Sequence, residues 1–367
     1  MNRPTIKDVA ARAGVSSATV SLVLRDSGQI PESTKQRVRD AMVAVGYVYN
    51  RRAAEMRSMT SRILGLVVAN VRNPYFAELT MAIEDTAHAA GYTLILGCSS
   101  DDVERQDEVL RAMAEHRVDG IILLPASHST RATLEAALLD RGLPHALVAR
   151  AVPGYECDYV GADNEASGRL VGRHLRDLGV ASVAFLGGVE HSIPREDRVR
   201  GLIDGLGPAF HGLVADVPSP NDASIGLSGL VDQALSAGQV PEAIVAYNDM
   251  HAFVIAGALR AHGLEPGRDV ALASFDNVPE AAHQFPSLTS ADGFPTRVGE
   301  VATELVLRAI SSGGRPPERV LIEPELEIRS STLSWVEQRS GPGGQQSGAE
   351  GQRSGAAAVR GRARASG

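Results

Sequence analysis

The sequence predicts a small all-α head followed by a larger α/β body made of two similar lobes. The first 46 residues show helical spacing broken by glycines, whereas from residue 63 onward short apolar runs alternate with amphipathic stretches. Continuous apolar strands separated by helices are typical of parallel sheets covered on both faces. About four such units precede Asp163 and about four follow it, and this repetition predicts the two lobes.

The composition is that of a globular chain with two or three domains. Of its 367 residues, 44% are hydrophobic and 22% are charged. The two cysteines cannot build a disulfide framework, no secretory signal opens the chain, and the apolar run at 63–69 is too short to cross a membrane. We therefore expect a cytoplasmic protein that has no membrane partner.

The net charge of −8 is unevenly distributed along the chain. Residues 1–62 hold 11 Lys or Arg against 5 Asp or Glu, while residues 63–367 hold 25 against 39. A basic head on an acidic body is expected when one end of a chain contacts phosphate groups. A basic solvated face would give the same count, so charge alone leaves both alternatives open.

Three short helices are predicted in the head. Thr5 is a candidate N-cap for a helix over 6–13, which Gly14 ends. A second helix is expected over about 17–25, and a third begins after Pro31. The third helix has apolar residues at helical spacing: Val38, Ala41, Met42 and Val45. So short a segment has a marginal core, so we expect it to be tethered to something larger.

The first two helices carry the residues that a helix-turn-helix requires. A small residue at the helix contact, a glycine at the turn and apolar anchors are all present: Ala10, Gly14, Val15, Val20 and Val23. With these inward, the outward face of the second helix is expected to meet base edges in the major groove. The residues of that face are Ser17, Ala18, Ser21, Leu22 and Arg25. Thr5, Ser16 and Thr19 are candidate donors to phosphate oxygens.

Residues 5–58 closely resemble the head of the lactose/galactose repressor (LacI/GalR) family of transcription regulators. Both T-I-x-D-V-A-x-x-A-G-V-S-x-x-T-V-S and G-Y-x-x-N-R are present, whereas an unrelated three-helix bundle would need neither. The resemblance implies a lambda-repressor-like helix-turn-helix domain at 1–49. It also implies a homodimer, or a higher assembly, on near-palindromic operator DNA.

The resemblance further implies that residues 50–61 form a hinge that folds on DNA and enters the minor groove. Asn50, Ala53 and Met56 are the expected contacts, with Met56 as the apolar wedge where the family carries leucine. Leu22 stands where relatives often carry arginine, and leucine cannot donate to guanine. We therefore expect methyl and hydroxyl contacts from the second helix, and more specificity from Arg25, the hinge and DNA shape.

The resemblance continues to about residue 335 and implies a body like a periplasmic-binding protein of type I. In that fold two doubly wound parallel-sheet lobes are joined by three crossing strands. The effector-binding and dimerisation domain is expected over 62–339, with lobe 1 at about 62–161 and 294–323 and lobe 2 at about 164–290 and 326–339. The Gly-, Ser-, Ala- and Arg-rich tail at 340–367 is expected to be disordered.

Ligands of open parallel sheets bind beyond the carboxyl ends of the strands, and polar and aromatic residues follow several of the predicted strands. By position or by resemblance, the candidate effector contacts are Asn73, Tyr75, Phe76, Asp163, Arg198, Asn248 and Asp276. Phe76 in the core and Arg198 in a surface salt bridge are the structural alternatives. Arg195 is a weaker candidate, and Asp249 is either a helix cap or a ligand contact.

An Asp, an Arg and an Asn that converge with aromatic rings suit a hydroxyl-rich sugar or sugar derivative. A nucleobase or nucleoside corepressor, stacked on Tyr75 or Phe76, is the alternative. The second crossing reads Gly293-Phe294-Pro295, where relatives often carry a polar residue before the proline, so a more apolar pocket is expected there. The implied function is a sequence-specific, DNA-binding transcriptional repressor whose operator affinity the effector controls.

Catalytic signatures are absent from the sequence. GLSGL at 226–230 is not the G-x-S-x-G elbow, and the chain holds neither a phosphate-binding loop nor an H-E-x-x-H pair. Its cysteines and histidines show no zinc spacing. We expect no enzyme activity, no cofactor and no metal. A cytosolic sugar-binding protein or an enzyme on the same body is the remaining alternative, while a periplasmic receptor would lack the head.

Overall fold

The computed structural model describes residues 4–24, 30–47, 60–208, 210, 212–219, 227–236, 240–312 and 315–340. The chain divides into two compact units, residues 1–61 and residues 62–367. The hinge residues 50–59 and the tail after Ser340, for which the sequence predicts a conditional helix and disorder, lie outside the described residues.

The described part of the head contains three helices, as the sequence predicts. They are α1 (Ile6–Ala13), α2 (Ser17–Leu24) and α3 (Glu32–Val45). Thr5 opens α1: its backbone N–H and its hydroxyl both donate to the Asp8 carboxylate, at 2.8 and 2.7 Å. Gly14 ends α1 with a left-handed φ of 65°. The core is small, and Val9, Val20 and Val38 form its fully buried centre.

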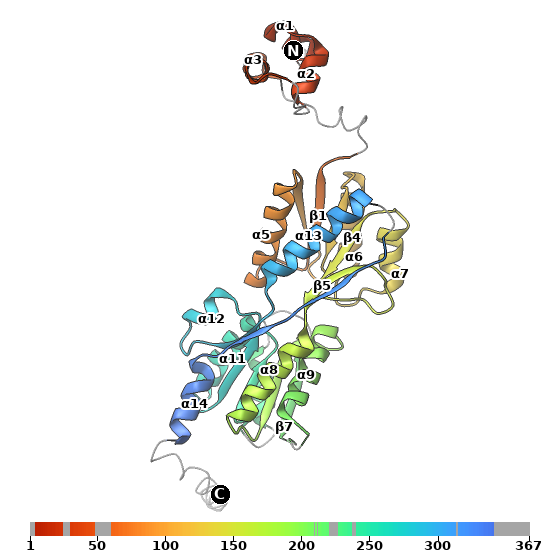
Figure 1. Cartoon of the computed structure of the whole chain (residues 1–367). Coiled ribbons are helices and arrows are strands. Elements are labelled where there is room, and N and C mark those ends of the chain that lie inside the picture. Colours follow the sequence, from red (N-terminus) through yellow and green to blue (C-terminus); the bar gives the residue numbers. More distant parts are fainter. Residues whose placement is uncertain are drawn as a thin grey trace, which may run out of the picture. The chain divides into compact units, whose positions relative to one another are not determined.

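The first sheet of the body has six parallel strands and belongs to lobe 1 (Figure 1). In sheet order the strands are β11 (Arg319–Ile322), β5 (Asp158–Ala162), β4 (His145–Val148), β3 (Gly120–Leu123), β1 (Ile63–Val68) and β2 (Thr93–Cys98). Its helices are α5 (Pro74–Ala89), α6 (Val103–Glu115), α7 (Arg131–Leu134) with the π-helix η1 (Glu135–Leu139), and α13 (Pro295–Ser312).

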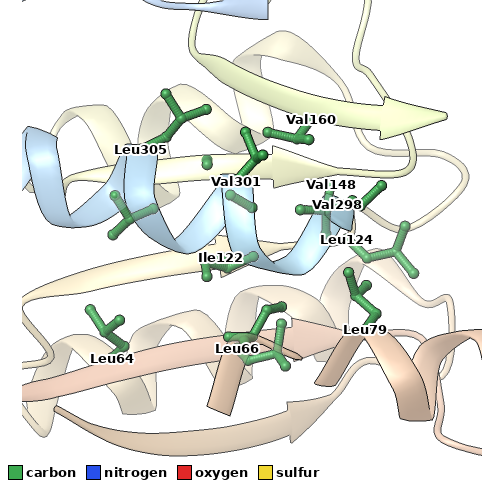
Figure 2. Packing of buried hydrophobic residues seen from close by; sticks show 14 of the residues in the cluster. Leu64, Leu66, Leu79, Ile122, Leu124, Val148, Val160, Val298, Val301 and Leu305 are labelled. Carbon is green, nitrogen blue, oxygen red and sulfur yellow. The ribbon is translucent and has the colours of Figure 1, made fainter. Parts of the chain in front are cut away.

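Both faces of this sheet are covered at its centre, which explains why β1 and β3 are continuous apolar runs, whereas the edge strands β2 and β11 are partly exposed. Figure 2 shows one face, where Leu66 and Ile122 of the sheet meet Leu79 of α5 and Val301 of α13. The opposite face packs against α6, α7 and η1 through a separate buried cluster.

The second sheet also has six strands and belongs to lobe 2. In sheet order they are β12 (Glu325–Glu327), β10 (Thr289–Asp292), β9 (Ala271–Phe275), β8 (Ala243–Ala246), β6 (Val183–Val189) and β7 (Leu213–Ser219). The helices of lobe 2 are α8 (Asn164–Asp177), α9 (Ile193–Leu206), α10 (Leu227–Ser236), α11 (Asp249–Ala261), α12 (Pro279–His283) and α14 (Ser330–Ser340).

The chain crosses between the lobes three times. The crossings follow β5, β10 and β11, and each places the carboxyl end of a strand at the boundary between the sheets. One pairing departs from the predicted parallel pattern, because β12 pairs antiparallel with β10. The cause is topological: β11 runs toward the boundary, so its continuation β12 runs away from it, whereas β10 runs toward it.

No described helix is long and apolar enough to span a membrane.

Candidate functional site: the outward face of α2 and a pocket between the lobes

The candidate DNA-contacting residues that the structure describes lie on the surface of the head or at its edge. Val20 of α2 is fully buried, while Ala18 and Leu22 are exposed and Ser17 and Ser21 are partly exposed. This orientation follows from the helical repeat, which turns one side of α2 into the core and the other outward. Arg25, Asn50, Ala53 and Met56 lie outside the described residues.

The start of α2 is held by two local devices. The Ser16 hydroxyl accepts from the Thr19 backbone N–H at 3.0 Å and lies 2.8 Å from the Thr19 hydroxyl, so Ser16 acts as an N-cap. Arg37 of α3 donates to the Ala13 carbonyl at 2.6 Å and so ties α3 to the end of α1. The sequence reasoning missed Arg37, because a contact over 24 positions leaves no local pattern.

A pocket lies between the two lobes at the carboxyl ends of their strands. Its lining comprises Asn73, Tyr75, Phe76, Leu124, Ala149, Arg150, Ala162, Asn164, Pro194, Arg198, Tyr247, Asn248 and Asp276. Six of the seven candidate effector residues are in this set, so the structure brings them together from positions up to 203 apart in the chain. The cavity has a volume of about 50 Å³.

Asp163 is the seventh candidate, and its side chain has another role. Its carboxylate accepts from the Ala166 backbone N–H at 2.9 Å, which makes it the N-cap of α8. The pocket is lined instead by its two neighbours, Ala162 and Asn164. The rule that a polar residue after a strand lines the pocket holds here for Asn164. It does not hold for Asp163, because the side chain of Asp163 caps the helix that follows.

Arg198 is the central cation of the pocket. Its Nε donates to Asn164 Oδ1 at 2.8 Å and its Nη1 donates to the Tyr247 carbonyl at 2.5 Å. The guanidinium also lies over the rings of Tyr247 and Phe275, 4.9 and 4.7 Å from their centroids. The side chain is only 12% exposed, so the alternative of a surface salt bridge is wrong.

Four glycines allow α9 to place Arg198 against α8. A Cβ on Gly201 would lie 2.0 Å from the Glu165 carbonyl oxygen, and one on Gly168 would lie 2.2 Å from the Arg198 carbonyl oxygen. Gly172 and Gly205 make the same kind of approach one turn further on. The two backbones therefore touch, and any side chain at these positions would push α9 and its arginine away.

Asp276 is the buried acceptor that faces Arg198. Arg198 Nη2 lies 3.5 Å from Asp276 Oδ1, and Asn73 Nδ2 donates to Asp276 Oδ2 at 3.0 Å. Asn73 comes from lobe 1, so this second bond crosses between the lobes. Burial raises the pKa of Asp276, while the Arg198 guanidinium opposes the rise.

A polar network holds the loop that presents Asp276. Asp276 and Asn277 both have left-handed backbones, with φ of 102° and 50°, which non-glycine residues rarely adopt. Asn277 Nδ2 donates to Asp292 at 2.9 Å, and Arg329 Nη2 donates to Asn277 Oδ1 at 2.7 Å. The pocket carboxylate is therefore positioned by residues at the second and third crossings.

Asp249 lies behind this loop and is fully buried. Its carboxylate accepts from the Ser290 hydroxyl at 2.7 Å, from the Val278 backbone N–H at 2.8 Å, and from the Ser274 hydroxyl. Burial, together with the nearby Asp276 carboxylate, raises the pKa of Asp249 to about 7. Neither sequence alternative for Asp249 describes this role: Asn248 caps α11, and Asp249 does not line the pocket.

Arg150 is a pocket cation that the sequence reasoning missed. Its Nη1 donates to Asp101 at 2.7 Å and to the Pro125 carbonyl at 2.6 Å. The residue is 8% exposed, and within the described part of the chain its buried Nε has no hydrogen-bond partner. Arg150 follows the apolar run at 145–149, so the rule that found Asn248 and Asp276 would also have found it.

Three further expectations concern the pocket and metals. Arg195 does not line the pocket and donates through Nε to the Gly187 carbonyl at 2.8 Å. Gly293 does not line it either, and a Cβ there would lie 2.8 Å from the Ala162 Cβ, so this glycine allows two crossings to approach. The described residues include no group of three His, Cys, Asp or Glu side chains that could hold a metal ion.

Comparison with known families matches two models to this chain. Residues 5–50 match the model of bacterial regulatory proteins of the lacI family, and residues 173–332 match a periplasmic binding protein-like domain. The ribose operon repressor of Halalkalibacterium halodurans is 30% identical over 336 residues, which cover 89% of this chain and 97% of that protein. The chain belongs to the LacI family.

Other LacI-family proteins match over nearly the whole chain. The HTH-type transcriptional repressor PurR of Aliivibrio fischeri is 29% identical over 333 residues, covering 90% of this chain and 98% of that protein. These relatives are transcriptional regulators and not enzymes, and the same function holds for this LacI-family chain.

Solved structures show the same fold. The lac repressor dimer bound to operator and the anti-inducer ONPF gives a TM-score of 0.79 at 22% identity, covering 90% of this chain and 99% of that one. A complex of the transcriptional regulator CelR with cellobiose gives a TM-score of 0.67 at 24% identity, covering 90% and 100%. The predicted helix-turn-helix head and two-lobed body are therefore confirmed.

Proposed function

We propose that this LacI-family protein is a cytoplasmic repressor that binds a near-palindromic operator as a homodimer or higher assembly. A sugar or sugar derivative bound between the lobes controls its affinity for the operator. The observation that carries the effector assignment is the buried pair of Arg198 and Asp276, 3.5 Å apart at the boundary between the lobes. The basic head carries the DNA assignment, together with the family match at 5–50.

The chemistry of the pocket suits adjacent hydroxyl groups. A guanidinium and a carboxylate can each bind two groups at once, and neighbouring hydroxyls on a sugar ring present that spacing. Asn164 and Asn248 add side-chain amides to the lining. The Oδ1 of Asn248 accepts from the His251 backbone N–H at 2.9 Å, which leaves its Nδ2 as the group for a ligand.

The alternative of a nucleobase requires a flat aromatic face. Tyr75 packs into the core of lobe 2, and its ring meets Phe76 edge to face, with centroids 5.3 Å apart and planes at 89°. Because Tyr75 is only 7% exposed, it offers little ring face on which a base can stack, and this favours a sugar. The names of the ribose operon repressor and the cellobiose complex support the same ligand class.

The size of the cavity links ligand binding to the arrangement of the lobes. A cavity of about 50 Å³ is narrow for a sugar ring. We therefore expect side chains or whole lobes to move apart when the effector enters. The bond from Asn73 to Asp276 crosses between the lobes and competes with the effector for the same carboxylate. The effector shifts operator affinity by binding one lobe arrangement more tightly than the other.

The test begins with DNA and continues with ligands. A random duplex pool and the regions around its own and neighbouring genes are incubated with the full chain at low salt, and the bound sequences are footprinted. D-ribose, cellobiose and other sugars are then titrated into the complex, beside adenine, guanine and hypoxanthine. We expect a defined footprint that a sugar weakens or strengthens. Failure to bind DNA at low salt would overturn the repressor, and a response to bases alone would favour the nucleobase alternative.

A further inference from the structure

The outward side of α2 holds only methyl-bearing and hydroxyl side chains. From Ser17 to Leu24 the helix reads SATVSLVL, without a charged or amide side chain. Ala18 and Leu22 lie one turn apart on the side opposite the buried Val20, and Leu22 is 39% exposed. The two side chains therefore form a short apolar strip on the surface of a basic head.

Only one base-edge feature in the major groove fits such a strip. Guanine is read by arginine or lysine, adenine by asparagine or glutamine, and cytosine by a carboxylate, because each presents donors or acceptors. Thymine alone presents a C5-methyl group, which an apolar side chain contacts by excluding water. The hydroxyls of Ser17 and Ser21 can hydrogen-bond to more than one base, so they discriminate little between bases.

The contacts of α2 within the head fix the direction in which Ala18 and Leu22 point. Ser16 caps α2 through the Thr19 backbone N–H at 3.0 Å. Val20 is fully buried against the other two helices and sets the rotation of α2 about its axis. Ala18 and Leu22 are thus held in a defined direction, as a contact with individual methyl groups requires.

We propose that Ala18 and Leu22 read thymine methyl groups, so that the operator half-site carries thymine where α2 meets the major groove. The inference rests on the proposed function and adds the base class that the recognition helix selects.

The test removes methyl groups from the DNA and leaves the protein unchanged. After a binding site is selected from the random pool, each thymine of one half-site is replaced in turn by deoxyuridine, which pairs identically but lacks the methyl. We expect affinity to fall about three- to tenfold at one or two positions, the loss typical of one buried methyl group, and to stay constant elsewhere. At those positions a 5-methylcytosine·guanine pair should bind better than a cytosine·guanine pair.

A protein variant then assigns the effect to its residue. Leu22→Ala should bind the thymine site more weakly and lose the uridine penalty at one position. Ala18→Gly should do the same at the neighbouring position. Val43→Ala is the matched control, because Val43 is an apolar residue of the head that is 83% exposed on α3. It should leave both affinities and the penalty unchanged.

Two outcomes would overturn the inference while leaving the repressor in place. In the first, uridine at every position binds the wild-type chain as well as thymine does. In the second, the uridine penalty persists in both Leu22→Ala and Ala18→Gly. A pool that yields no bound sequence would instead overturn the proposed function, and this inference with it.

Discussion

The two lobes share one topology but hold their pocket walls in different ways. In both, six strands follow the same order, and the parallel strands run toward the boundary between the lobes, whereas β12 runs away from it. Lobe 1 supports its wall with an apolar core and with the ion pair from Arg150 to Asp101, and its wall residue Ala149 also has a left-handed φ, of 58°. Lobe 2 supports its wall with a buried carboxylate, Asp249, and with two strained residues, Asp276 and Asn277. The shared topology places the pocket at the same edge of both sheets. The polar contacts beneath each wall differ between the lobes, and they determine where the charged groups of the pocket are held.

The largest expected loss of stability comes from the backbone contact between α8 and α9 in lobe 2. Gly201→Ala places a Cβ 2.0 Å from a backbone oxygen of α8, so α9 must move. We expect a loss of about 3 kcal/mol in the free energy of unfolding. The measurement is urea unfolding followed by the fluorescence of Trp335, the one tryptophan of the sequence, which is buried in lobe 2.

The matched control is the same substitution on another helix of lobe 2. Gly257→Ala on α11 meets nothing within 4 Å, so it should be neutral or stabilise by up to about 1 kcal/mol. Equal effects of the two substitutions would contradict the backbone contact between α8 and α9.

A second prediction concerns the pH dependence of the free energy of unfolding that Asp249 causes in lobe 2. The folded-state pKa of about 7 is raised above the ordinary value of 3.8, so the folded chain keeps a proton that the unfolded chain releases. The stability from this group is present below pH 4 and is lost as pH rises through 7, by about 2–3 kcal/mol between pH 4.5 and 7.5. Asp249→Asn should remove this fall, measured by urea unfolding between pH 4.5 and 7.5.

Asp269→Asn provides the control for that prediction. Asp269 is a surface residue of lobe 2, and its hydrogen bond from Arg268 lowers its pKa. Its contribution has the opposite sign, because it is present at neutral pH and lost in acid. The fall between pH 4.5 and 7.5 should therefore persist in Asp269→Asn. If Asp249→Asn keeps the same fall, the buried carboxylate is not its source.

The smallest expected effect is in lobe 1. Arg150→Met removes the partner of Asp101, but Asp101 keeps hydrogen bonds from the backbone and hydroxyl of Ser127, and its side chain is 21% exposed. We expect a loss of about 1 kcal/mol in the free energy of unfolding, because solvent and Ser127 satisfy the remaining charge. The measurement is urea unfolding at pH 7, with Arg131→Met on the exposed surface as the control. A loss as large as that of Gly201→Ala would remove the contrast between the lobes.

The sequence predicts the strands that bury continuous apolar runs. The runs at 63–69, 242–247 and 269–275 become β1, β8 and β9. By contrast, β12 reads Glu-Leu-Glu with both glutamates exposed, so no apolar run marks it, and only the family resemblance places a crossing there. Its antiparallel pairing follows from the path of the chain between the lobes and is invisible in a local pattern.

The candidate site is predictable where a strand and its polar successor are adjacent in the sequence. Asn248 and Asp276 satisfy that rule and line the pocket, whereas Asn73 lines it from five residues beyond the end of β1. Asn164 was missed by one position, because Asp163 takes the capping role. The role of Asp249 depends on serines 25 and 41 positions away, and such contacts exist only once the chain has folded.

The central claim is that a ligand bound between the lobes, at Arg198 and Asp276, controls DNA binding by the head. The most direct test is operator binding, followed by fluorescence anisotropy, for the wild-type chain, Asp276→Asn and Asp163→Asn, with and without the sugar that the screen identifies. We predict a change of about tenfold or more in operator affinity for the wild-type chain. Asp163→Asn should respond in the same way because asparagine also caps a helix, and Asp276→Asn should bind the operator normally but not respond. A full response in Asp276→Asn would contradict the claim.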